Sequence, residues 1–219
     1  MKKFIKSFFV LLLALQCVSA SAAEPVKIAC IGDSITFGYG LRSPFTDSYP
    51  AVLQTMLGEE YTVRNFGFSA RTLSQTGDRP YMKEMMYAQA KAFEPDVVTI
   101  MLGTNDVKPE NWREKDYEDS LNQMISDMKE LPSHPKILIC LPATVHGERW
   151  GIKDSTIVAG AIPILLKVAA QENLPVIDTH AATADYAEHF PDFIHPDVEA
   201  SKALAEAVYK GLKENGAVK

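Results

Sequence analysis

Five short apolar segments recur along the chain, each followed by a longer segment whose apolar positions have helical spacing. Their length and their content of β-branched residues predict strands. The predicted strands are 26–31, 61–65, 97–102, 136–141 and 175–178. The run 97–102 (Val-Val-Thr-Ile-Met-Leu) has no charged residue. Continuous apolar runs of this kind are typical of strands buried on both faces of a sheet.

The intervening segments carry apolar residues three and four positions apart, which predicts amphipathic helices. The predicted helices are 49–57, 81–93, 114–131, 158–171 and 198–214. Pro163 falls inside the fourth of these, so we expect it near the start of that helix or at a kink.

Alternation of strands and helices predicts an α/β fold, a three-layer sandwich in which a five-stranded parallel sheet has helices on both faces. No repeat, low-complexity tract or linker interrupts residues 24–219, so we expect a single domain there. Ligands of such sheets bind at the carboxyl ends of the strands. The loops after the five strands are therefore the first place to look for chemistry.

The first 23 residues have the pattern of a secretory signal peptide. Lysines at 2, 3 and 6 precede an apolar run at 8–15, and small residues follow at 19–23. The run is too short to span a bilayer, which needs about 20 apolar residues. We expect cleavage after Ala22 or Ala23 and export to the periplasm or the medium. Lipoprotein anchoring at Cys17 is less favoured, because Gln16 is a poor residue before a lipidated cysteine.

The net charge is −6 (22 Lys and Arg against 28 Asp and Glu), and removal of the three leader lysines makes the chain more acidic still. An acidic chain without a basic run argues against nucleic acid as a partner.

Three of the strand ends carry residues suited to acyl transfer. Ser34 follows the first strand in Gly32-Asp33-Ser34 and is a candidate nucleophile. Gly67 follows the second strand and Asn105 the third, and a backbone amide and a side-chain amide are both suitable oxyanion donors. Taken alone, Ser34 is better explained as a helix N-cap and Gly67 as an ordinary turn glycine, and Asn105 suits an Asx-turn as well as an oxyanion donor.

A short segment before the last helix contains Asp192 and His195, three residues apart. One loop can therefore supply a base and the carboxylate that orients it. His180 and His189 compete for the role of base, but neither has an aspartate three residues before it.

The four segments Gly32–Thr36, Asn65–Ser69, Gly103–Asp106 and Asp192–Pro196 resemble the consensus blocks of the SGNH hydrolases, also called the GDSL lipase/esterase family. The likeness extends from the first strand to the last helix. It departs mildly at Ile35-Thr36 and at Asp197, where Leu-Ser and Asn are common. The resemblance implies that Ser34, His195 and Asp192 form the catalytic triad. It also implies an oxyanion hole of the Ser34 and Gly67 amides and the Asn105 side chain, with no metal or other cofactor.

The same resemblance implies a flavodoxin-like sheet with strand order 2-1-3-4-5. Cys30 on the first strand and Cys140 on the fourth would then be separated by the third, about 10 Å apart. A disulfide requires Cα atoms within about 7 Å. We therefore expect two free, buried thiols.

The substrate is indicated by two further segments. The loop 103–112 resembles that of bacterial carbohydrate and sialate O-acetylesterases, and Trp112 in it is a candidate for stacking on a sugar ring. After the fourth strand, His146, Arg149 and Trp150 are further candidates for substrate binding. Packing beneath a loop explains either tryptophan equally well.

The expected function is therefore a serine esterase acting on short acyl groups, acetyl first, on carbohydrates. A lysophospholipase or thioesterase of the same family is the alternative. Such an enzyme needs an apolar groove for the acyl chain near Ser34, whereas the loops after the third and fourth strands are polar. An inactive glycan-binding module is less favoured, because every residue type required for the reaction is present.

Overall fold

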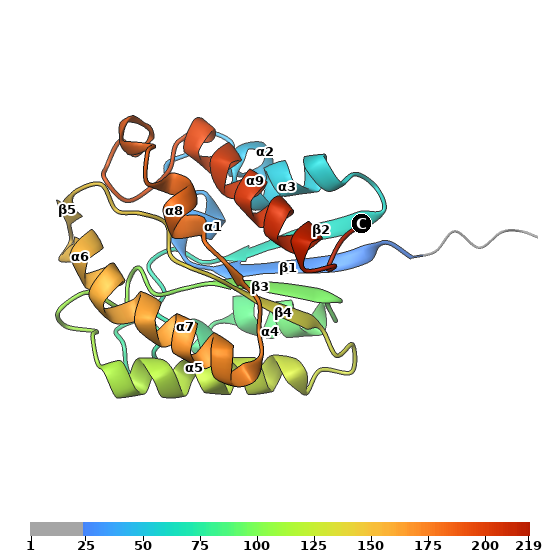
Figure 1. Cartoon of the computed structure of the whole chain (residues 1–219), viewed down its shortest axis with the longest axis horizontal. Helices are drawn as coiled ribbons and strands as arrows, with labels where there is room; N and C mark the ends of the chain where they lie inside the picture. The colour runs from blue at the N-terminus through green and yellow to red at the C-terminus, as the bar shows by residue number, and fades with distance from the viewer. Residues whose placement is uncertain (1–23) are drawn as a thin grey trace, which may run out of the picture.

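The computed structural model describes residues 24–219, and the predicted signal peptide with Cys17 lies outside them. Five parallel strands form the central sheet in the order β2-β1-β3-β4-β7, which confirms the predicted order (Figure 1). The strands are β1 (Val26–Gly32), β2 (Tyr61–Gly67), β3 (Val97–Met101), β4 (Lys136–Cys140) and β7 (Val176–Ile177). All five predicted strands are therefore present, and the last is the shortest.

Helices cover both faces of the sheet, as predicted (Figure 1). One face is covered by α4 (Met85–Ala92), α5 (Glu114–Lys129) and α7 (Ile162–Glu172). The other is covered by α3 (Tyr49–Leu57) and α9 (Val198–Glu214), which contact each other. Side chains alternate between the two cores: Ile28 and Cys30 pack toward α3 and α9, and Ala29 and Ile31 pack toward the opposite face.

Shorter elements complete the chain, and several of them lie beside the carboxyl ends of the strands. They are α1 (Ser34–Phe37), α2 (Pro44–Asp47), the 3₁₀ turns η1 (Tyr81–Lys83) and η3 (Ala187–His189), α6 (Asp154–Thr156), the π-helical η2 (Ile157–Ala161), α8 (Thr179–Thr183) and the antiparallel pair β5 (Glu148–Arg149) and β6 (Ile152–Lys153). The hairpin of β5 and β6 was not predicted.

Two predicted helices differ from the structure at their starts. The helix predicted over 81–93 is divided, because Glu84 has an extended backbone between η1 and α4 (φ −92°, ψ 152°). The helix predicted over 158–171 begins four residues earlier with α6. Pro163 lies two residues after the π-helical turn η2, so it falls at an irregularity inside the helix, where prolines within helices are usually found.

This continuous helical stretch, Asp154–Glu172, is the one helix of the described residues with the length and mean hydropathy (1.2) of a membrane span. About a third of it is buried inside the molecule (33%), and its α7 part packs against α5. Core helices of compact domains have the same character, so the stretch by itself indicates no membrane.

Cys30 and Cys140 are free and buried, on strands separated by β3, as expected. Burial raises the pKa of the Cys30 thiol to about 12. Both residues therefore act as small apolar core residues, not as reactive thiols.

The loops after β2 and β3 are joined by a buried carboxyl group. Asp106 is fully buried, and its two oxygens accept the amides of Leu73 (3.0 Å) and Ser74 (2.8 Å). Asn111 adds a second link, since its side-chain amide donates to the Asn105 carbonyl (3.0 Å) and to Asp78 (2.9 Å). Burial raises the pKa of Asp106 to about 7 despite the two amide donors.

We expect Asp106→Asn to destabilise the protein more at pH 5 than at pH 8. A pKa of about 7 in the folded state lies above the ordinary aspartate value of about 4, so this carboxyl's contribution to stability is complete below that value and is lost as pH rises through 7. Asparagine does not titrate, and it leaves one of the two amides without an acceptor, at a cost of about 1–3 kcal/mol. Urea unfolding at both pH values measures the difference.

The matched control is Asp119→Asn, which alters an exposed carboxylate on α5 paired only with Lys115. It should change the free energy of unfolding little, and equally at both pH values. If Asp106→Asn behaves in the same way, the pKa of Asp106 is not raised in the folded protein.

Candidate active site

Ser34 lies just beyond the carboxyl end of strand β1, as the first residue of α1. The N-cap of this helix is Asp33, whose carboxylate accepts the amide of Ile35 (2.9 Å). The hydroxyl of Ser34 is therefore not needed as a cap. Its side chain instead faces a histidine from the other end of the chain.

His195 and Asp192 complete a hydrogen-bonded path to Ser34. The distance from His195 Nε2 to Ser34 Oγ is 2.8 Å, and that from His195 Nδ1 to Asp192 Oδ2 is 2.7 Å. With its proton on Nδ1, the imidazole donates to the carboxylate and accepts from the serine hydroxyl. This is the arrangement in which a histidine serves as a general base toward serine.

The loop of Asp192 is organised around its carboxylate. Oδ1 accepts the backbone amides of Ile194 (3.1 Å) and His195 (2.8 Å), while Oδ2 faces the imidazole. Partial burial opposes ionisation, but the hydrogen bonds from the His195 side chain and from the two amides outweigh it and hold the pKa of Asp192 below its usual value. Asp192 is thus a carboxylate at neutral pH.

The side chain of Asn105 lies next to Ser34, in the loop after β3. It is nearly fully buried, and its Nδ2 donates to the Arg71 carbonyl (3.1 Å) and lies 3.4 Å from Asp33 Oδ2. Burial raises the pKa of Asp33. The sequence-predicted donor is therefore in place at the pocket, held between the loops that follow β1 and β2.

The backbone amide of Gly67, the donor expected from the sequence, has a partner within the fold. Its amide donates to Asn65 Oδ1 (2.8 Å), and Gly67 lines a different cavity from Ser34. A Cβ atom at this position would lie 2.2 Å from the amide nitrogen of Phe37. Glycine is thus needed here because the end of β2 approaches the backbone of α1 closely, and the amide is already committed to Asn65.

Ala70 lies three residues after Gly67, in the loop that follows β2. It lines the cavity that contains Ser34 and Asn105, and its backbone is left-handed (φ 65°). Among the described residues its amide has no hydrogen-bond acceptor. The sequence gives no sign of this conformation, because the left-handed region is usually signalled by glycine and this position is alanine.

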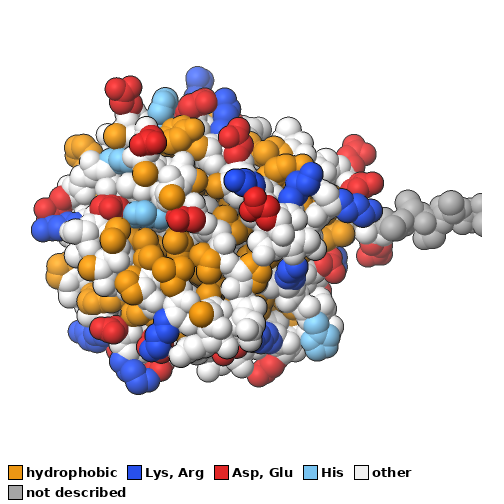
Figure 2. Space-filling model, viewed as in Figure 1, with side chains coloured by type: hydrophobic (Ala, Val, Ile, Leu, Met, Phe, Trp, Pro, Cys, Tyr) orange, Lys and Arg blue, Asp and Glu red, His pale blue; other side chains and the backbone are white. Residues whose placement is uncertain are grey.

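These residues surround an open cavity of about 550 Å³. Besides Ser34, His195, Ala70 and Asn105, its wall combines apolar side chains with charged groups of both signs. The other lining residues are Tyr39, Ser69, Asp78, Arg79, Thr104, Lys108, Glu110, Trp150, Ile152 and Ile194. Acidic and basic side chains are likewise interspersed over the face of the molecule shown in Figure 2.

The four candidate substrate-binding residues separate into two pairs. Trp150 lines the cavity, half-exposed, with its ring centroid 5.9 Å from that of His195, and Arg149 lies beside it, 3.7 Å from Asp192 Oδ2. Trp112 instead packs on Tyr117 (5.5 Å). His146 bonds the Thr183 carbonyl through Nε2 (3.0 Å). Neither Trp112 nor His146 lines the cavity of Ser34.

The competing histidines lie elsewhere. His189 pairs with Asp197 (2.9 Å) and His180 bonds the Pro142 carbonyl (3.0 Å), and neither lines the cavity of Ser34. Within residues 24–219, no group of three or more His, Cys, Asp or Glu side chains is arranged to hold a metal ion.

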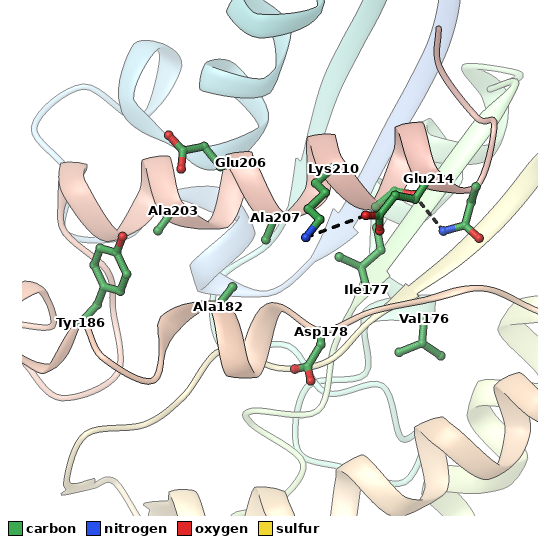
Figure 3. Close-up of a pocket in the computed structure, with 12 residues that line it drawn as sticks. Val176, Ile177, Asp178, Ala182, Tyr186, Ala203, Glu206, Ala207, Lys210 and Glu214 are labelled. Atoms are coloured by element: carbon green, nitrogen blue, oxygen red, sulfur yellow. Dashed lines mark hydrogen bonds and ion pairs between the residues drawn. The ribbon is translucent and has the colours of Figure 1, made fainter.

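Another cavity, of about 510 Å³, lies along β7 and α9 (Figure 3). Its charged groups are largely engaged in the fold: Asp178 caps α8 by accepting the Ala181 amide (2.8 Å), and Lys210 pairs with Glu214 (3.8 Å). It contains none of the residues that the sequence singles out for chemistry.

Known proteins resemble this chain in sequence and in fold. An acetylxylan esterase of Xylanibacter ruminicola is 39% identical over 218 residues, which is 91% of this chain and 45% of that protein. The chain therefore spans about half the length of this relative. A carbohydrate acetylesterase from Sinorhizobium meliloti superimposes with a TM-score of 0.71 at 20% identity, covering 87% of this chain and 99% of that one.

An aryl esterase from M. smegmatis gives a TM-score of 0.72 at 20% identity, covering 86% of this chain and 99% of that one. At such identities the structural likenesses establish the fold alone. The model of the GDSL-like lipase/acylhydrolase family matches residues 30–203, from β1 into α9. The chain therefore belongs to the GDSL-like lipase/acylhydrolase family.

Proposed function

We propose that this protein is a serine esterase that hydrolyses short-chain esters, acetyl first, on carbohydrates. The observation that carries the proposal is the continuous hydrogen-bonded path from Asp192 through His195 to Ser34, with distances of 2.7 and 2.8 Å. Ser34 and His195 line an open cavity, so a substrate carbonyl has access to the serine oxygen.

In the proposed reaction, His195 accepts the proton of Ser34 as the serine oxygen attacks the ester carbonyl. Collapse of the tetrahedral intermediate transfers that proton to the departing alcohol and leaves an acyl-serine. Water, activated by the same histidine, then releases the acid and restores Ser34. Asp192 remains ionised and holds the imidazole in the tautomer that accepts from serine.

The negative charge of the intermediate requires preorganised donors. The Asn105 side chain and the amide of Ser34, which begins α1 and so has no intrahelical acceptor, are two of them. We assign the third to the amide of Ala70 in place of Gly67, because the Ala70 amide lies at the cavity and has no acceptor among the described residues. The Gly67 amide is occupied by Asn65.

Two observations support a short acyl group on a carbohydrate. The relative of 39% identity is an acetylxylan esterase. The cavity also presents charged groups of both signs, Asp78 and Glu110 with Arg79 and Lys108, which suit hydroxyl groups better than an alkyl chain. A lysophospholipase or thioesterase is the alternative within the family, and an inactive glycan-binding module is the alternative outside catalysis.

Export is part of the proposal. The leader at 1–23 has the organisation of a signal peptide, so the mature protein would begin close to residue 24 and act as one domain in the periplasm or outside the cell.

Ser34→Ala and His195→Ala should each lower kcat on p-nitrophenyl acetate by several orders of magnitude, because each removes a group that the whole triad depends on. The control Ser126→Ala changes an exposed serine on α5 and should leave the rate unaltered. Activity that survives Ser34→Ala would refute the proposed nucleophile, and a wild type without esterase activity would favour the inactive module.

Asn105→Ala should lower kcat about 10²–10³-fold with little change in KM, since the lost donor acts on charge that develops only in the transition state. Steady-state kinetics on the same ester measure the effect. Asn122→Ala, on α5 and outside the cavity, is the matched control. A near-normal rate for the Asn105 variant would remove this side chain from the oxyanion hole.

A series of p-nitrophenyl acetate, butyrate and octanoate separates the two enzymatic hypotheses. The charged groups that line the cavity predict that kcat/KM is greatest for acetate and falls with chain length. A preference for octanoate would instead support a lipid esterase or thioesterase.

A further inference from the structure

The β5–β6 hairpin beside the cavity has an unusual turn. Its two central residues are Trp150 (φ 52°) and Gly151 (φ 75°). Two-residue hairpins with positive φ at both positions strongly favour Asn-Gly, and a bulky side chain at the first position is strained. The hairpin therefore holds a tryptophan where the backbone disfavours one.

Burial does not explain this tryptophan. Trp150 is 51% exposed, whereas Ile152 across the turn is buried in the core. The exposed ring lines the cavity of Ser34 and lies 5.9 Å from the His195 ring. Backbone strain that serves no packing purpose, at the edge of a reactive serine, points to a role in binding.

Arg149 connects the tryptophan to the triad. Its guanidinium lies over the Trp150 ring (4.2 Å to the centroid), and its Nη1 is 3.7 Å from Asp192 Oδ2. The cation thus contacts the aromatic ring and the carboxylate at the same time. It covers part of the indole while the remainder of the ring stays exposed.

The segment leading into the hairpin is also fixed to the loop of Asp192. The His146 amide donates to the Phe193 carbonyl (2.9 Å), and Gly147 packs so closely on the Phe193 ring that a Cβ atom would lie 2.7 Å from it. Across the hairpin, Lys153 pairs with Glu148 (3.2 Å). The hairpin and the loop that carries Asp192 and His195 therefore form one connected unit.

We propose that the β5–β6 hairpin is the carbohydrate-recognition element of this site, in which the exposed face of Trp150 stacks on the sugar ring whose ester lies at Ser34. A sugar presents an apolar ring face surrounded by hydroxyl groups. The indole contacts the apolar face, and the other charged groups that line the cavity, Asp78, Arg79, Lys108 and Glu110, contact the hydroxyl groups. Arg149 is a positioning residue that holds the indole and the Asp192 carboxylate. This inference rests on the proposed esterase function and specifies the substrate at the same site.

The test compares acetylated xylo-oligosaccharides with p-nitrophenyl acetate, whose alcohol offers no sugar face. Trp150→Ala should lower kcat/KM on the oligosaccharides about tenfold or more, mainly through KM, and lower it by a clearly smaller factor on p-nitrophenyl acetate. Trp150→Phe should restore most of the loss. Phe45→Ala removes an aromatic ring that is 96% exposed on α2 and should affect neither substrate.

Arg149→Ala has a second readout. The loss of a cation beside Asp192 makes protonation of the adjacent imidazole easier, so the acid limb of the pH–rate profile should move to higher pH on both substrates. Arg149 faces the Asp192 carboxylate, which is paired with His195, and its guanidinium stacks on the Trp150 ring. Arg149→Lys, which keeps the charge, should restore the profile.

Equal losses on both substrates for Trp150→Ala, or no loss on either, would overturn the stacking role. An unmoved pH profile for Arg149→Ala would overturn the positioning role. A wild type that hydrolyses p-nitrophenyl acetate through Ser34 but cleaves neither acetylated xylo-oligosaccharides nor acetylated sialic acid would overturn the carbohydrate assignment and leave the esterase standing. A wild type that shows no Ser34-dependent hydrolysis of any ester tested would instead refute the proposed function itself.

Discussion

The hydrogen bond between Ser34 and His195 joins residues 161 positions apart in sequence, and the arrangement of the site depends on it. Such a bond forms only if the loop after β1 and the loop before the last helix meet at one edge of the sheet. The parallel sheet places the carboxyl end of β1 at that edge, between those of β2 and β3. The packing of α9 against α3 then holds the end of the chain over the same edge.

Gathering these loops at a sheet edge has an electrostatic cost. Asp33 and Asp106 are both buried there, and burial raises the pKa of each. They are retained because they organise backbone: Asp33 caps the helix that begins with Ser34, and Asp106 holds the amides of Leu73 and Ser74. The fold thus places two unfavourable carboxyl groups where they fix the loops of the proposed nucleophile and oxyanion donors.

Much of this arrangement was predictable from the sequence, because hydrophobic spacing determines strands and helices and βα alternation determines a parallel sheet. The boundaries of α3 and α9 were predicted to the residue. The proximity of Ser34, Asp192 and His195 also followed, since each residue lies in a loop that the sheet order brings to one edge. The strand order itself came from family resemblance.

The sequence did not reveal which residues line the cavity, because that depends on contacts formed only in the folded protein. Gly67 was selected because glycine permits close approach, and close approach does occur, but to the backbone of Phe37. Ala70 was overlooked because its left-handed backbone is a property of the folded loop, not of alanine. Trp112 and Trp150 are indistinguishable by residue type, and only the packing of Trp112 on Tyr117 separates them.

The hairpin shows how substrate choice can vary while the proposed chemistry stays fixed. The Ser34–His195–Asp192 geometry depends on the sheet edge and on the amides around Asp192. Trp150 depends instead on a two-residue turn between strands of two residues each, which pair with each other and not with the central sheet. A substitution in this hairpin would therefore alter which sugar stacks on the indole and leave the position of Ser34 unchanged. Arg149 limits that independence, because it is the contact through which a change at the indole reaches Asp192.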